Sequence, residues 1–175
     1  KSSFSSNMLA LNETRPVVLN LHDGLNYFIE FRKDVITKRT VFKLNKARDK
    51  ANLLIGLSIA VNSIDEVIDL IKKSKNPSEA KEKLLAKNWP IKSSIVEYVK
   101  LISPSTKIVS NKVNLDEEQA KAILELRLQK LTALEREDLF TSLKDLIDDV
   151  NGYLKILNSD KELIKILKNE LLEVK

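Results

Sequence analysis

Residues 24–73 form a run of fifty residues without proline, and Gly24 and Gly56 are the only glycines in it. Proline and glycine interrupt helices more strongly than any other residue, so their scarcity favours continuous helix here. An unbroken helix of fifty residues would extend for about 75 Å, so an interruption along it is expected. We therefore predict a helix over residues 24–73, with Asp23 as its N-cap and a break between Gly56 and Asn62.

The apolar residues of this predicted helix recur in steps of three and four, the spacing of a helix that packs along its length against another helix. They form two sets in different register, Phe28, Phe31 and Val35, then Leu44, Ala47, Ala51, Leu54, Ser58 and Val61. A second seam repeats near the C-terminus at Leu139, Leu143, Leu146, Val150, Tyr153 and Leu157. We expect the segments near 25–70 and 136–175 to pair antiparallel as a coiled coil.

The remaining segments predict short elements. Apolar runs at 8–11 and 17–21 flank a turn-rich link and predict a β-hairpin. Asn76, Pro77 and Glu79 are typical of a helix start, and Ser159 with Glu162 has the spacing of a capping box. Helices are expected over 77–87, 91–102, 117–130 and from 159 onward, with a loop over 103–114.

These expectations define a mainly all-α fold with a small N-terminal β-hairpin. The chain holds only three glycines, four prolines and 5% aromatic residues, a composition that suits long helices. We divide it into an N-terminal β segment (1–23), a first long helix (24–73), a globular helical head (74–135) and a returning long helix (136–175). The two long helices are expected to form an arm that bears the head.

The stretch from Asp116 to Glu135 has apolar residues on two faces. Asp116 and Gln119 have the spacing of a capping box. The residues that follow carry more apolar positions than the single stripe of a helix that packs on one core. These positions are 120, 122, 123, 124, 126, 128 and 131. A short helix with two apolar faces must bury both. One face can pack in its own domain, and the other needs a second surface, possible on another chain.

Three stretches of the chain share their residues with one known family, in that family's order. They are E-Q-A-K-A-I-L-E-L-R-L-Q-K-L-T-A-L-E at 118–135, F-R-K-D-V-I-T-K-R-T at 31–40, and L-I-G-L at 54–57 followed by N-S-I-D-E-V-I at 62–68. They resemble segments of the A-type chain of bacterial DNA gyrase, and the stretch at 118–135 is similar to its exit-gate segment. The sister A-type chain of topoisomerase IV is the alternative within the family.

The resemblance implies a non-catalytic coiled-coil and exit-gate region, in an ATP-dependent type II topoisomerase that passes one DNA duplex through a transient break in another. It implies a homodimer through the head, whose contact we place at Ala122, Ile123, Leu126, Arg127 and Lys130. It also implies the gyrase B protein and double-stranded DNA as partners, and a bacterial cytoplasmic location. No cofactor is expected in this chain, because the resemblance assigns ATP and Mg²⁺ to the parent complex through the gyrase B protein.

Catalytic chemistry is not expected from these residues. The family cleaves DNA with a tyrosine that follows an arginine, whereas the tyrosines here follow Asn26, Glu97 and Gly152. The chain has no cysteine and a single histidine, so it lacks the usual ligand pattern of a zinc site. No apolar run approaches the roughly 20 residues of a membrane span, so no membrane partner is expected.

A basic run at residues 31–50 leaves one alternative open. It holds eight Lys and Arg against two Asp, out of a formal net charge of +5 for the whole chain. Clustered cations favour contact with a polyanion, but they also occur on the solvated flank of a coiled coil. The possible DNA contacts are Arg32, Lys33, Lys38, Arg39 and Lys43. A stand-alone helical scaffold or nucleic-acid-binding coiled coil is therefore the alternative from another class.

Overall fold

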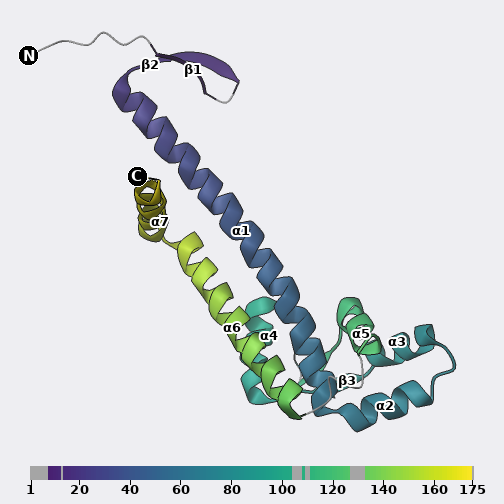
Figure 1. Cartoon of the computed structure of the whole chain (residues 1–175). Helices are drawn as coiled ribbons and strands as arrows, with labels where there is room; N and C mark the ends of the chain where they lie inside the picture. Colours follow the sequence, from purple (N-terminus) through teal and green to yellow (C-terminus); the bar gives the residue numbers. More distant parts are fainter. Residues whose placement is uncertain (1–7, 13, 104–107, 109–110, 127–132, 175) are drawn as a thin grey trace, which may run out of the picture. The chain divides into compact units, whose positions relative to one another are not determined.

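The computed structural model describes residues 8–12, 14–103, 108, 111–126 and 133–174. The described chain is mainly helical, as predicted, with a small N-terminal hairpin (Figure 1). The elements in order are β1 Met8–Asn12, β2 Arg15–Leu19, α1 Leu21–Asn62, α2 Ile64–Lys72, α3 Pro77–Ala86, β3 Asn88–Pro90, α4 Ser93–Ile102, β4 Lys112–Asn114, α5 Glu117–Leu124, α6 Ala133–Asn158 and α7 Asp160–Glu173.

The chain divides into two compact units, which are described separately below. Unit 1 comprises Lys1–Lys43 with Tyr153–Lys175, and unit 2 comprises Leu44–Gly152. Helices α1 and α6 each contribute residues to both units. The predicted four-part division and the coiled-coil pairing of the long segments stay predictions.

Unit 1 begins with the predicted hairpin. Strands β1 and β2 pair antiparallel from Met8 opposite Leu19 to Asn12 opposite Arg15. The chain then enters α1, whose first turn is capped by Asn20, because its side-chain oxygen accepts a hydrogen bond from the Asp23 amide at 2.8 Å. The prediction of Asp23 as the N-cap is wrong: the helix starts at Leu21, and Asp23 lies within its first turn.

The start of α1 leaves large apolar side chains exposed. The spacing predicts that Phe28 and Phe31 pack, but 44% and 64% of their surfaces remain accessible. Leu9 and Leu11 of β1 are also exposed. Apolar packing in unit 1 centres instead on Ile36 and Leu167, which are almost completely buried. The three-and-four spacing alone therefore does not identify the buried face of this part of α1.

Unit 2 is built around an apolar core contributed by all of its helices. The core includes Ala51, Ile55, Ile59, Ala60, Val67, Leu84, Trp89, Ile91, Ile95, Val99, Ile102, Val113, Leu115, Ala120, Ile123, Leu143 and Ile147. Helix α1 ends at Asn62 and α2 begins at Ile64, so the predicted break falls at the end of its expected range. The Asn62 side-chain amide donates to the Ser58 carbonyl at 2.8 Å, and so caps one of the last carbonyls of α1.

The segment between α3 and α5 contains two short strands that the sequence did not predict. Strands β3 and β4 pair antiparallel, with Trp89 opposite Val113. Trp89 is fully buried, and its indole N–H donates to the Leu84 carbonyl at 3.0 Å. A buried tryptophan needs such a partner for its one polar group. The predicted loop over 103–114 is therefore partly strand, and β4 closes the core beside Trp89.

Two predicted caps differ from the structure in detail. Asn76 is the N-cap of α3, but its side chain makes no capping hydrogen bond with the described chain, and Glu79 instead accepts from the Lys75 amide at 2.8 Å. Ser159 is the N-cap of α7, and its side chain likewise makes no capping bond within the described chain. The predicted Ser159–Glu162 capping box is therefore wrong, although the helix begins where that pattern placed it.

The α6 seam provides a test of the core. Leu143 is 1% exposed, whereas Leu146 is only partly buried against the same core. Replacing Leu143 with Ala should lower the free energy of unfolding by about 2–5 kcal/mol, through lost burial and the cavity left behind. Leu146→Ala is the matched control and should cost less. Urea unfolding followed by circular dichroism measures both, and equal losses would contradict this assignment of the buried face.

Candidate functional site

Helix α5 starts with a complete capping box. The Asp116 carboxylate accepts from the Gln119 amide at 2.8 Å, and the Gln119 side-chain oxygen accepts from the Asp116 amide at 3.0 Å. Two amides at the helix start that have no partner within the helix are thereby satisfied. This is the arrangement predicted from the sequence, and it fixes where α5 begins.

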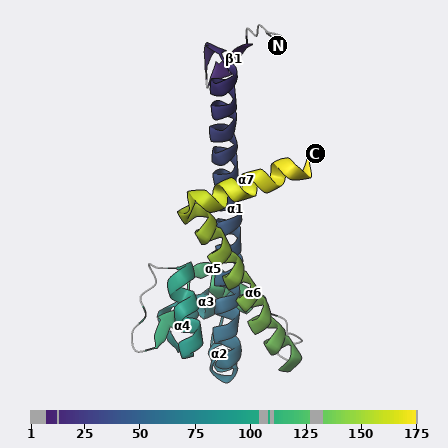
Figure 2. The ribbon, with the colours of Figure 1, turned by 90° about the vertical axis from the view of Figure 1, so that its left-hand side faces the viewer.

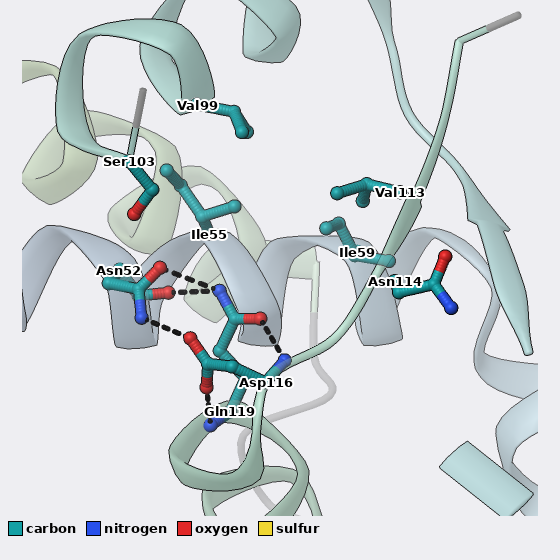
Figure 3. Close-up of a pocket in the computed structure, with 9 residues that line it drawn as sticks. All are labelled: Asn52, Ile55, Ile59, Val99, Ser103, Val113, Asn114, Asp116 and Gln119. Carbon is teal, nitrogen blue, oxygen red and sulfur yellow. Dashed lines mark hydrogen bonds between the residues drawn. The ribbon is translucent and has the colours of Figure 1, made fainter. Parts of the chain in front are cut away.

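The same two side chains bind α5 to α1 (Figure 3). The Gln119 side-chain amide donates to both the backbone and side-chain oxygens of Asn52, each at 2.9 Å. The Asn52 amide in turn donates to the second oxygen of Asp116. We call this set the Asn52–Asp116–Gln119 clamp. Because Gln119 is only 6% exposed, its polar atoms need these partners, and the clamp supplies them.

Gly56 allows α5 to approach α1 closely. A Cβ atom at this position would lie 2.7 Å from both Cβ and Cγ of Gln119, which is shorter than any normal contact. Glycine within a helix destabilises it by roughly 0.5–1 kcal/mol relative to alanine. Its presence one turn after Asn52 therefore has a steric reason. The sequence shows the glycine, but only the structure shows that Gln119 occupies the space above it.

A cavity of about 40 Å³ lies beside the clamp, with apolar walls that include Ile55, Ile59 and Val99 (Figure 3). Ligand pockets typically have volumes of about 300–1,000 Å³, so this cavity is too small for a nucleotide or another cofactor. A water molecule needs only about 10–15 Å³ of such volume. The cavity can therefore hold water against the clamp and no larger ligand.

The predicted contact residues of α5 divide between core and surface. Ile123 is 4% exposed and fills the core of unit 2, next to Ala120. Ala122 and Leu126 are half-buried and keep accessible surface. Helix α5 ends at Leu124, before the predicted end near 130, and Arg127 and Lys130 lie outside the described residues. Among the described residues of the predicted patch, Ala122 and Leu126 therefore keep accessible surface, whereas Ile123 lies in the core.

The predicted DNA-contacting side chains of α1 are mostly engaged in ion pairs. Arg32 and Arg39 both reach Glu170 of α7, with 2.7 Å for Arg32, and Lys33 reaches Asp160 at 2.9 Å. Lys38 pairs with Asp34 one turn away at 2.7 Å, and Lys43 is exposed. Sequence reasoning missed the partners on α7, because residues 127 or more positions apart in the chain give no local signal.

Glu170 is the carboxyl group most strongly affected by this arrangement. A hydrogen bond from the Arg39 guanidinium holds the pKa of Glu170 below its ordinary value of 4.5, against the opposing effect of burial, and Arg32 adds to the lowering. Glu79 of α3 also has a lowered pKa, chiefly because the Lys83 side chain donates to it. Each lowered pKa means that the charged form is favoured in the folded chain.

Two further features concern metal ions and membranes. Over the described ranges, no group of three or more His, Cys, Asp or Glu residues is placed to hold a metal ion. No helix in that part of the chain is both long and apolar enough to cross a membrane.

Comparison with known proteins identifies the family of the chain. Residues 1–172 match the family model for the A chain of DNA gyrase and topoisomerase IV. The DNA gyrase A protein of Rickettsia felis is 47% identical over 176 residues, which cover all of this chain and 19% of that protein. The corresponding proteins of Aeromonas salmonicida and Pseudomonas aeruginosa are 39% and 38% identical, again over all of this chain and 20% of theirs.

The chain is mainly helical, and it spans about a fifth of the length of the curated relatives that it matches. It belongs to the DNA gyrase/topoisomerase IV A family. This finding confirms the family that the three sequence stretches resemble.

The close approach of α5 at the clamp predicts that Gly56 cannot be replaced without a loss of stability. Replacing Gly56 with Ala should destabilise unit 2 by about 1–3 kcal/mol, because the new Cβ forces α5 away from α1. Gly152→Ala is the matched control: nothing lies within 4 Å of the place that its new Cβ would take, so alanine should stabilise α6 by about 0.5–1 kcal/mol. Thermal unfolding measures both variants, and an unchanged or raised melting temperature for Gly56→Ala would contradict the clamp.

The lowered pKa of Glu170 predicts that the stability of unit 1 depends on pH. Because its folded pKa lies below its ordinary value, the ion pairs stabilise unit 1 fully above about pH 4.5 and lose this effect as pH falls through the lower, folded value. The protection of α7 amides from hydrogen exchange, relative to their intrinsic exchange rate at each pH, should therefore decrease over that range. Glu170→Gln should remove this part of the pH dependence, while Glu173→Gln should keep it. Identical pH profiles for the two variants would contradict the role of Glu170.

Proposed function

We propose that this chain is the exit-gate region of a gyrase A protein, a non-catalytic element through which two copies of that protein meet. The proposal rests on the fixed position of α5. The Asn52–Asp116–Gln119 clamp and the buried Ile123 hold this helix on the core. Ala122 on this fixed helix, and Leu126 just after its end, keep accessible surface. A rigid element with a small apolar surface suits a contact that closes and reopens.

The size of the contact is the physical reason for this design. Obligate dimers typically bury about 2,000–5,000 Å², and such an interface would resist opening. A contact centred on Ala122 and Leu126 would be much smaller, and a twofold contact would use the same patch from each copy. A gate of this kind can release a transported duplex and then close again without unfolding either chain.

The parent enzyme that we infer is an ATP-dependent type II topoisomerase. Its other partners would be the gyrase B protein, which would provide the ATP and Mg²⁺ chemistry, and double-stranded DNA. A bacterial cytoplasmic location follows from the same inference. The equivalent region of the topoisomerase IV A protein is the alternative, since one family description covers both proteins. The similarity of the gyrase A relatives over the whole chain supports gyrase.

Sedimentation velocity of the isolated chain tests the proposed contact. The wild-type chain should form dimers at high concentration, and Leu126→Asp should shift it toward monomers while far-UV circular dichroism retains the helical signal. The reason is that a half-exposed side chain can carry a charge in the monomer, whereas a dimer contact would bury that charge without a partner. Lys121→Asp, at an exposed position of α5, should leave the dimer unaffected.

Ile123→Asp serves as the folding control. Since Ile123 lies in the core, its replacement should cost several kcal/mol and unfold unit 2 rather than separate two folded chains. A wild-type chain that remains monomeric at the highest concentration would contradict an autonomous contact through α5.

A further inference from the structure

Helix α7 crosses α1 within unit 1 (Figure 2). Its carboxylates at Asp160 and Glu170 are ten residues apart, or about 15 Å along a helix. Their partners on α1 are Lys33 for Asp160, and Arg32 and Arg39 for Glu170, and they fall within seven residues of each other. If α7 ran side by side with α1, carboxylates ten residues apart on α7 would pair with residues about ten positions apart on α1. Helix α7 therefore covers a short section of α1, and both ends of this section are held by charge.

Arg32, Arg39 and Lys43 form a row on one face of α1. Spacings of seven and four residues return to nearly the same direction on a helix of 3.6 residues per turn. Glu170 accepts from the first two, and Lys43 makes none of the ion pairs found among the described residues. Helix α7 thus neutralises only part of the row, and an exposed cation lies one turn beyond the covered part.

The carboxylate of Glu170 does not fully satisfy the two guanidinium groups that it contacts. The Nε atom of Arg32 is buried and has no hydrogen-bond partner in the described structure. One negative charge also faces two positive ones. A phosphate group offers more acceptor oxygens than a carboxylate and matches the forked donors of arginine. The row is therefore better suited to phosphate than to its present occupant.

We propose that α7 is a displaceable cover on a phosphate-binding row, and that the backbone of duplex DNA binds Arg32, Arg39 and Lys43 by releasing Glu170. Binding begins at Lys43, which is exposed, and advances along α1 as α7 leaves. Partly exposed ion pairs of this kind are weak, so a polyanion that contacts several cations at once can displace them. The basic run is then a conditional contact that α7 regulates.

Fluorescence anisotropy with a labelled duplex tests the competition. Glu170→Gln should tighten DNA binding by about threefold to tenfold at fixed salt, the range expected when one or two partly exposed ion pairs no longer compete. Glu173→Gln is the matched control, since it removes the same charge from an exposed position of α7. Equal tightening in both variants would show that net charge alone acts, and would overturn the proposal.

The row itself is tested in the Glu170→Gln background. Replacing Arg32 and Arg39 with Gln should abolish the gain and reduce the slope of log affinity against log salt by about one for each arginine. An unchanged slope, or no measurable duplex binding by the Glu170→Gln chain, would also overturn the proposal. Neither result depends on dimerisation through α5, which sedimentation measures separately.

The movement of α7 has its own measurement. The chain contains no cysteine, so Glu30→Cys on α1 and Lys168→Cys on α7 provide two unique, exposed positions for spin labels without altering the ion-paired residues. Dipolar spectroscopy should show one short distance in the free chain and a longer, broader distribution when saturating duplex is added. An unchanged distance in DNA-bound chain would show that α7 stays in place, and the proposal would fail.

Discussion

The buried hydrogen bonds of Gln119 are the interaction on which unit 2 depends. A side-chain amide that is almost completely buried is stable only if its donors and acceptor are paired, and Asn52 and Asp116 pair them. These bonds form only where two helix backbones come close, which requires a glycine at position 56. Hydrogen bonding and steric fit thus select the same position of α5, and the apolar core can fill only around that position.

The two units are stabilised by different interactions. Unit 2 has a continuous apolar core, whereas unit 1 buries few large side chains and joins α7 to α1 through carboxylates and guanidinium groups. Burial of apolar surface is insensitive to moderate salt, but exposed ion pairs are screened by it. The structure of unit 1 therefore depends more strongly on ionic conditions, while the apolar core of unit 2 keeps α5 in position.

Sequence patterns predicted the structural features that depend on residues close together in the chain. Periodicity and the Asp116–Gln119 spacing located the helices and the start of α5, because both signals act within a few residues. The contact of Gln119 with Asn52 and the contacts of Glu170 with the two arginines could not be predicted, since these partners lie more than sixty positions away in the chain. Strands β3 and β4 were missed because three residues are too few to show a period of two. The expected packing of Phe28 and Phe31 is wrong because periodicity gives no information about what covers a face.

Trp89 gives the chain an optical property that follows from its place in unit 2. It is the single tryptophan of the sequence, and it lies in the core with its indole N–H bonded to a backbone carbonyl. Its emission should be blue-shifted in the native chain and should shift to the red only when unit 2 melts. Unit 1 contains no tryptophan, so far-ultraviolet ellipticity reports on both units and fluorescence on one. A difference between the two transitions would measure how cooperatively the units unfold.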